Sequence, residues 1–216
     1  MKSVLGYVDT EHYTYGELFN EINANTGGIN CGVEVFDRAD STEEFQAMFS
    51  VRGKALYTKM DFLFKMIGEI LNSSKLEDTK RLYEIVASVK SRAQVNLTGA
   101  GHSTAVLRAA AYSSPMAAFQ DEMAGIGYYQ FIEKLEKDFE QRKEETVEEL
   151  CKLMKKILRP ENFMISYTGE RESLETVQKL AGTVKAGLGT EPVEKSKEKL
   201  TCTKKNEGFK TSGQVQ

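Results

Sequence analysis

Residues 29–53 read INCGVEVFDRADSTEEFQAMFSVRG, and this stretch decides the fold class. From residue 29 to 36 apolar and other residues alternate, and the same alternation returns from residue 45 to 52. A period of two is typical of half-buried strands. The polar residues 37–44 predict a turn, and an eight-residue connection is too short for a parallel crossover. We therefore expect two antiparallel neighbouring strands.

Outside this stretch the apolar residues mostly follow the helical period of 3.6. A glycine pair, Gly27-Gly28, ends the first helical pattern just before the strands. Helices are predicted at about 12–28, 58–71, 77–97, 103–112, 116–140, 143–158 and 171–187, with a further strand at 163–167. Because the helices are segregated from an antiparallel sheet, we predict an α+β fold with a block of helices packed on one face of the sheet.

Composition excludes several classes of protein. The 216 residues carry 29 Lys and Arg against 32 Asp and Glu, a net charge of −3. A nucleic-acid binder would show a basic surplus on one face, so we expect no nucleic-acid partner. No apolar run approaches the roughly 18 residues of a membrane span, and the first residues do not resemble a signal peptide. The three cysteines are odd in number and far apart, which favours reduced thiols and a cytoplasmic location.

Two histidines and three cysteines limit the catalytic options. His12 and His102 lie in no zinc-binding motif, so we expect a surface histidine and a helix-capping or packing histidine. Cys31 and Cys151 fall on apolar faces and are expected to be small core residues. Cys202 lies in a polar stretch with no histidine nearby. We predict no catalytic, metal-binding or cofactor-binding residue, although a thiol hydrolase using Cys202 or Cys31 remains a weak third hypothesis.

Carboxylates are plentiful between residues 133 and 149, but they interleave with lysines and arginines. This spacing is typical of a solvated helix face with ion pairs between residues four apart. The stretch from residue 189 onward holds only five apolar residues and cannot support a core, so we expect it either to be flexible or to need a partner strand that these 216 residues do not include.

Four motifs occur in a fixed order along the chain. They are YTYGELFNEINANTGGI at 13–29, GHSTAVLRAAAYSSP at 101–115, FQDEMAGIGYYQFI at 119–132 and ILRPENFMISYTGE at 157–170. Together they resemble the second half of an insulinase-type (pitrilysin-type) zinc metallopeptidase, with the presequence-protease branch as the best match. The resemblance covers nearly the whole chain.

The resemblance implies an architecture. Four similar α+β domains form two bowls joined by a hinge, and they enclose a chamber in which unfolded peptides are cut. Residues 1–158 would belong to the third domain, without its beginning, and residues 159–216 would open the fourth, with a flexible polar tail from about 189. We therefore expect the sequence to be part of a longer chain.

The resemblance also implies that the reactive groups lie elsewhere. In the family, the zinc ligands and the base of the H-x-x-E-H motif belong to the first domain. The arginine and the tyrosine that the second half contributes to the active site lie late in the fourth domain. Zinc would be bound outside this chain, whose partners would be the N-terminal catalytic half and the peptide substrate. For this chain the resemblance implies residues that shape the chamber wall. They are Tyr13, Tyr15, Gly27, Gly28 and Ile29 at a sheet edge, and His102, Arg108, Glu122, Tyr128 and Tyr129 in the helical packing.

Two functions of different class follow. The first is a non-catalytic section of the wall of a zinc metalloendopeptidase, inactive alone. The alternative is a stand-alone module that binds peptides or assembles with a catalytic subunit. An H-x-x-E-H motif earlier in the same reading frame would favour the first function.

Overall fold

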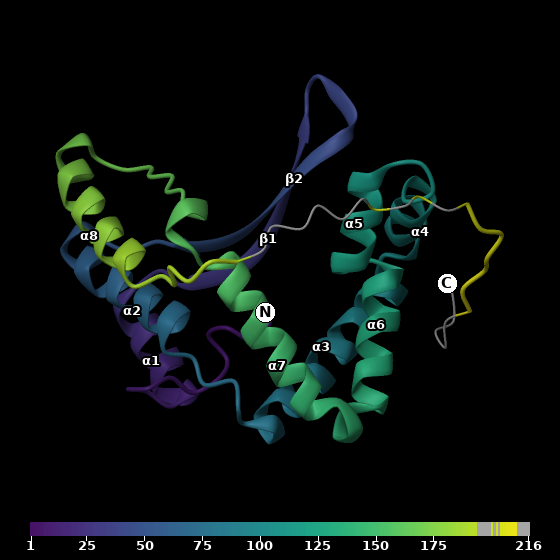
Figure 1. The fold of residues 1–216 in the computed structure, drawn as a ribbon, viewed down its shortest axis with the longest axis horizontal. Helices are drawn as coiled ribbons and strands as arrows, with labels where there is room; N and C mark the ends of the chain where they lie inside the picture. Colours follow the sequence, from purple (N-terminus) through teal and green to yellow (C-terminus); the bar gives the residue numbers. More distant parts are fainter. Residues whose placement is uncertain (194–199, 201, 203, 211–216) are drawn as a thin grey trace. The chain divides into compact units, whose positions relative to one another are not determined.

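The computed structural model describes residues 1–193, 200, 202 and 204–210, apart from the side chains of residues 42 and 43. It is an α+β fold with one two-stranded antiparallel sheet among these residues, as predicted (Figure 1). The elements are α1 (Tyr15–Asn25), β1 (Ile29–Arg38), β2 (Ser41–Gly53), α2 (Met60–Asn72), α3 (Thr79–Gly99), α4 (Gly101–Ala110), α5 (Pro115–Ala124), α6 (Ile126–Lys137), α7 (Phe139–Ile157) and α8 (Leu174–Ala186).

The chain forms two compact units. Unit 1 contains Met1–Gly32, Phe49–Leu82 and Lys143–Lys195, and unit 2 contains Val33–Met48, Tyr83–Arg142 and Ser196–Gln216. In unit 1, α2 packs against both α1 and α8. The apolar faces of these helices meet in a buried cluster of Leu5, Leu18, Ile22, Met66, Ile70, Leu71 and Val184.

Helix α1 begins and ends through local hydrogen bonds. The Thr14 hydroxyl accepts the Glu17 amide at 3.3 Å, and the Glu17 carboxylate accepts the Thr14 amide at 2.9 Å. This reciprocal pair satisfies amide groups that the first helical turn leaves unpaired. After the helix, Gly28 adopts a φ of +107°, a conformation that favours glycine, and the Gly27 amide donates to the Lys54 carbonyl at 2.7 Å. The glycine pair thus leads the chain directly into the hairpin.

The hairpin is longer, and its turn is tighter, than the sequence predicts. The predicted turn at 37–44 is wrong, because only residues 39 and 40 separate β1 from β2. The Arg38 guanidinium pairs with Asp40 at 2.8 Å and with Glu44 at 3.0 Å, all three side chains being exposed. Polar residues can therefore continue a ladder whose side chains face water, and polarity alone does not mark the turn.

The predicted strand at 163–167 is also wrong, since this segment has no regular secondary structure. Phe163 and Tyr167 lie partly buried against core clusters of unit 1, while Met164 and Ile165 are 69% and 44% exposed. Burial therefore does not alternate along this segment, because Ile165 is exposed like its neighbour Met164. Among the described residues no strand pairs with this backbone either, and an extended segment without a paired neighbour is not a strand.

In unit 2 the predicted single helix at 116–140 is two helices, α5 and α6, with Gly125 between them. Within α6 the buried face contains Ile132 and Leu135, and Phe131, which was expected on the apolar face, is 53% exposed. Phe139 begins α7 instead, is 1% exposed, and packs its ring 5.5 Å from that of Tyr83. Helix α5 packs against both α4 and α6.

Two expectations are not settled by the described residues. The flexible tail from about residue 189 falls partly on 194–199, 201, 203 and 211–216, which lie outside them. The domain boundary at residue 158 stays a prediction. None of the helices in the described ranges combines the length and the apolar character needed to cross a bilayer.

The core of unit 1 can be tested with two neighbouring residues of α1. Leu18 is fully buried and Phe19 is 58% exposed. We expect Leu18→Ala to lower the free energy of unfolding by about 3 kcal/mol because it leaves a cavity, and Phe19→Ala to change it by less than about 0.5 kcal/mol. Urea unfolding followed by circular dichroism measures both. Equal effects of the two substitutions would contradict this packing.

Candidate functional site

The most deeply buried charged side chain among the described residues of unit 2 is Asp121 in α5, which is 1% exposed. One carboxylate oxygen, Oδ1, accepts the amide of Ile126 at 3.0 Å, and the other, Oδ2, accepts the amide of Gly127 at 3.1 Å. These amides belong to the first turn of α6, where helices bind anionic groups. Asp121 therefore belongs to α5 and at the same time binds the first amides of α6, which explains why the helical stretch breaks between α5 and α6.

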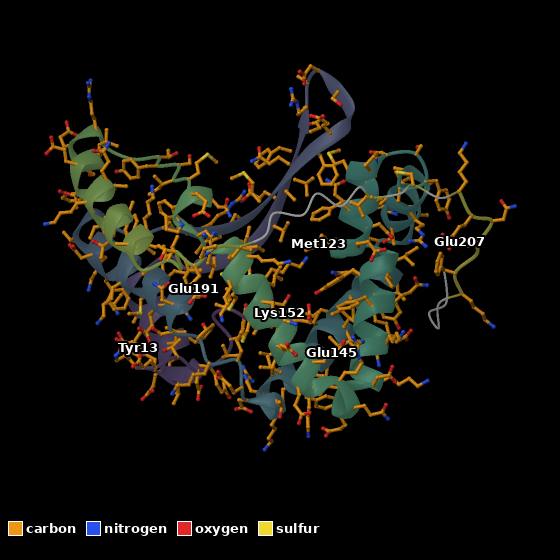
Figure 2. All side chains as sticks on the ribbon, in the orientation of Figure 1. Tyr13, Met123, Glu145, Lys152, Glu191 and Glu207 are labelled. Carbon is orange, nitrogen blue, oxygen red and sulfur yellow. The ribbon has the colours of Figure 1, made fainter. Side chains whose placement is uncertain are left out.

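Arg108 of α4 joins the same carboxylate. Its Nη1 lies 2.5 Å from Asp121 Oδ2, and its Nε lies 2.6 Å from Oε1 of Glu207. The Tyr112 hydroxyl donates to the same oxygen of Glu207. These four residues, Arg108, Tyr112, Asp121 and Glu207, are called the Arg108 cluster below. It ties α4, α5, α6 and the segment 204–210 of unit 2 together. Glu207 is the member of the cluster that is labelled in Figure 2.

The two glycines that flank the start of α6 make room for Asp121. A Cβ atom at Gly125 would lie 2.9 Å from the Cα of Asp121 and would collide with its Oδ1. At Gly127 a Cβ atom would lie 2.8 Å from Asp121 Oδ2 and 2.7 Å from Glu122 Oε1. Both positions therefore require glycine because the carboxylate approaches the backbone so closely.

The Arg108 cluster changes the acidity of its outer carboxylate. The hydrogen bonds from Arg108, and then from Tyr112, lower the pKa of Glu207 from its ordinary value of 4.5 to about 2. The same carboxylate raises the pKa of Tyr112 above its ordinary range. Because the pKa of Glu207 is depressed, its ion pair stabilises the bound segment fully above about pH 4.5 and loses this effect as the pH falls toward 2.

The sequence singled out five residues near the sheet edge, and all five lie in unit 1. Tyr13 packs partly buried against its core, and Ile29 contacts both core clusters. The Tyr15 ring is exposed and lies 3.7 Å below the guanidinium carbon of Arg81. Gly27 and Gly28 form the turn into β1. These residues shape local structure and form no cluster of reactive groups.

Of the five predicted packing residues, Arg108 is the one that holds the helices together. Glu122 and His102 are exposed, Tyr128 is half-buried, and the Tyr129 hydroxyl donates to Glu133 at 2.7 Å. The expectation that His102 caps or packs against its helix is therefore wrong, since its side chain is exposed and α4 begins after Ala100 without a side-chain cap. Sequence reasoning missed Asp121, Tyr112 and Glu207. The sequence offered one signal for Asp121, which is its position four residues before Gly125, the residue that precedes α6.

His12 is exposed, as expected for a surface histidine, and its Nδ1 lies 3.1 Å from Oε2 of Glu69. The backbone amide of His12 donates to the other oxygen of the same carboxylate at 3.2 Å. Within the described ranges, no three His, Cys, Asp or Glu side chains gather in a group that could hold a metal ion. The described residues therefore do not supply the ligand set that zinc requires.

The thiol of Cys31 differs in its pKa from the thiol of a cysteine nucleophile. Burial raises the pKa of Cys31 to about 11, whereas a nucleophilic cysteine has a lowered pKa. Cys151 and Cys202 are half-buried, and all three cysteines are free. No hydrogen bond joins any of them to a histidine among the described residues. This arrangement gives the thiol-hydrolase hypothesis no support at Cys31.

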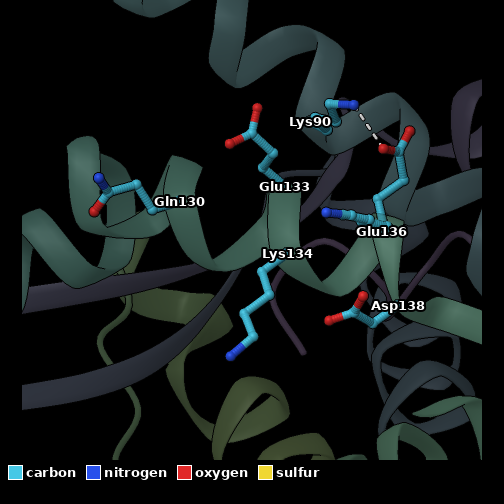
Figure 3. A pocket seen from close by; sticks show the side chains of 7 residues that line it. Lys90, Gln130, Glu133, Lys134, Glu136 and Asp138 are labelled. Atoms are coloured by element: carbon cyan, nitrogen blue, oxygen red, sulfur yellow. Dashed lines mark hydrogen bonds and ion pairs between the residues drawn. The ribbon is translucent and has the colours of Figure 1, made fainter. Parts of the chain in front are cut away.

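A hollow of about 580 Å³ lies on unit 2, beside α3 and α6 (Figure 3). Its lining contains three lysines and three carboxylates, so it carries no net charge, and Lys90 pairs with Glu136 at 2.6 Å. The lining residues are Lys90, Gln130, Glu133, Lys134, Glu136, Lys137 and Asp138. They include no histidine, cysteine, serine or aromatic residue, and we assign this hollow no chemistry.

The sequence of the chain matches the family described as Peptidase M-16C associated over residues 1–135. The chain belongs to this family. It is also 30% identical, over 99% of its own length, to Protein HypA of Clostridium perfringens. Two further relatives are the mitochondrial presequence protease of Yarrowia lipolytica, 29% identical over 65% of the chain, and presequence protease 1 of Arabidopsis thaliana, 25% identical over 79%.

This peptidase-associated chain spans 22% of HypA, 14% of the Yarrowia protein and 16% of the Arabidopsis protein. The matched region contains α1 to α5 and most of α6, and therefore includes Arg108 and Asp121. The resemblance identified from the four motifs is confirmed at the level of the family, and the chain is related to peptidases.

The close approach of Asp121 to Gly125 predicts a stability effect. We expect Gly125→Ala to lower the free energy of unfolding by about 1–3 kcal/mol, because the new methyl group displaces the carboxylate. Gly182→Ala is the control, since Gly182 lies inside α8 with open space around it, and it should raise stability by about 0.5–1 kcal/mol. Urea unfolding distinguishes the two signs, and a stabilising Gly125→Ala would contradict the contact.

The raised pKa of Cys31 predicts slow alkylation. At pH 8 a thiol with a pKa near 11 is only about one part in a thousand thiolate, so Cys31 should react far more slowly than it does in the urea-unfolded chain. Mass spectrometry after timed treatment with iodoacetamide measures this at each cysteine. Equal rates at Cys31 in the folded and unfolded chain would refute the assignment.

Proposed function

We propose that this chain is a non-catalytic section of a zinc-dependent metalloendopeptidase that degrades unfolded peptides inside a closed chamber. The observation that carries the proposal is that the chain matches a limited part of much longer relatives: 99% of it matches 22% of HypA, and 65% and 79% of it match 14% and 16% of two proteins named presequence proteases. The peptide-hydrolysing groups and the zinc ligands would then belong to another part of the same protein.

The geometry supports a structural role for this section. Among the described residues no group of His, Cys, Asp or Glu could hold a metal ion, the pKa of the Cys31 thiol is raised, and the buried pair of Arg108 and Asp121 serves helix packing. A chamber wall needs stiffness, because it must exclude folded proteins and keep water from the reacting groups opposite. Buried ion pairs that join several helices, as in the Arg108 cluster, give such stiffness.

The partners follow from the same proposal. The chain would pack against the N-terminal catalytic half of its own polypeptide and would face unfolded peptide substrates. Residues from 159 onward would open a second, similar domain. A cytoplasmic location is part of the proposal and is supported only by the three free cysteines, which suit a reducing compartment.

A two-part experiment tests the proposal. The reading frame that encodes the chain should contain an H-x-x-E-H motif upstream, and its full-length product should cleave a peptide of about 30 residues until a chelator is added. The isolated 216-residue chain should neither cleave that peptide nor bind zinc stoichiometrically, as measured by chromatography of the digest and by metal analysis.

Two results would contradict the proposed function. Chelator-sensitive cleavage by the isolated chain would place the reactive centre here and overturn the proposal. A reading frame that lacks any metal motif would overturn it as well and would favour the alternative, a stand-alone module for peptide binding or subunit assembly. Co-purification with a separate catalytic subunit would then identify the assembly role.

A further inference from the structure

Arg108 and Tyr112 form a ready-made arrangement of donors for a carboxylate. Arg108 lies in the last turn of α4 and Tyr112 lies in the turn that follows the helix, and both side chains reach the same carboxylate. Arg108 Nε lies 2.6 Å from Oε1 of Glu207, and Nη2 lies 3.2 Å from Oε2. With the Tyr112 hydroxyl added, three donors converge on one carboxylate. Two parallel hydrogen bonds from one guanidinium are the strong and selective form of this contact.

The guanidinium is held from behind. Asp121 is almost completely buried and binds the third nitrogen of Arg108, Nη1, at 2.5 Å. The carboxylate of Asp121 is itself fixed by the two amides at the start of α6. The Arg108 side chain is 15% exposed with Glu207 bound, and we expect the contact with Asp121 to hold its orientation when Glu207 leaves. A donor group that is fixed in advance loses little entropy when it binds a ligand.

The balance of charge favours an anionic ligand. Asp121 is shared between Arg108 and the positive end of α6, so the guanidinium is not fully neutralised by Asp121 alone. The outer edge of Arg108 remains available to a second carboxylate. A cavity of about 150 Å³ adjoins it, and its lining includes Arg108, Tyr112, Leu200 and Lys205.

The segment that occupies this edge is held as a peptide ligand would be. Residues 204–210 have no regular secondary structure and form no backbone hydrogen bond with any described residue. Their contacts with α4 are the Glu207 carboxylate and the Phe209 ring, whose centroid lies 5.7 Å from the guanidinium carbon of Arg108. A segment anchored by so few contacts opens easily.

We propose that Arg108 and Tyr112 form a peptide-binding site that recognises a glutamate followed two positions later by an aromatic residue. The chain's own residues 204–210 occupy this site reversibly and compete with a peptide of the same chemistry. The carboxylate supplies the charged contact, and the guanidinium lies over the face of the aromatic ring. The inference stands on these contacts and does not depend on the proposed peptidase.

Competition between the attached segment and a free peptide tests the site in the full 216-residue chain. The probe is a fluorescein-labelled peptide with the sequence of residues 204–210, KKNEGFK, titrated by fluorescence anisotropy. E207Q removes the attached competitor, which acts at an effective concentration of about 1 mM, so the peptide should bind E207Q about tenfold more tightly than the unsubstituted chain.

Three controls separate recognition from other effects. The peptide KKNQGFK should bind E207Q at least about tenfold more weakly than KKNEGFK, because it cannot accept a charged bidentate pair. Arg108→Lys in the E207Q background should weaken binding of KKNEGFK by a similar factor, since a lysine keeps the charge but loses the fork. E191Q removes an exposed carboxylate outside the site and should leave the affinity unchanged.

Three results would overturn the inference. Equal affinity of KKNEGFK for the unsubstituted chain and for E207Q would show that Glu207 does not occupy the site. No binding to E207Q at about 1 mM chain, or equal binding of KKNEGFK and KKNQGFK, would show that no carboxylate site exists. Unchanged circular dichroism of each variant confirms that the comparison is made between folded chains.

Discussion

The buried carboxylate of Asp121 is the constraint on which unit 2 depends. It takes two amides from the first turn of α6 and one guanidinium nitrogen from α4 while it belongs to α5, so one side chain fixes three helices. A buried charge without partners costs several kcal/mol, and it is tolerated here because every partner is supplied. The requirement for glycine at positions 125 and 127 and the outward edge of Arg108 both follow from this arrangement.

Much of the fold could be predicted because burial imposes its period on the residues. The alternation within 29–53 predicted the hairpin, and the period of 3.6 predicted most helices. The break at Gly125 was missed because the apolar spacing continues across it, and the carboxylate that causes the break acts through the backbone. The segment 163–167 shows the opposite failure, since its apolar residues alternate in the sequence while Ile165 is exposed and the backbone has no described strand to pair with. Arg108 was singled out by the resemblance, but Glu207 meets it only through a tertiary contact across 99 residues.

Membership in the peptidase-associated family relates the chain to peptidases. Among its described residues the buried pair of Arg108 and Asp121 joins two helices, burial keeps the thiol of Cys31 protonated, and both histidines are exposed. If the chain is the wall section that we propose, the Arg108 cluster would contribute to the stiffness of that wall. The carboxylate site proposed at Arg108 rests on the contacts of this chain alone, so it does not depend on what the longer protein does.

The most direct measurement of the central claim is a double-mutant cycle between α4 and α5. The free energy of urea unfolding is compared for the unsubstituted chain, Arg108→Met, Asp121→Asn and the double variant. If Asp121 and Arg108 stabilise each other as a buried pair, the double variant should be less destabilised than the sum of the two single variants, by about 2–3 kcal/mol. Effects that add to within about 0.5 kcal/mol would show that the helices are held by other contacts and would contradict the account.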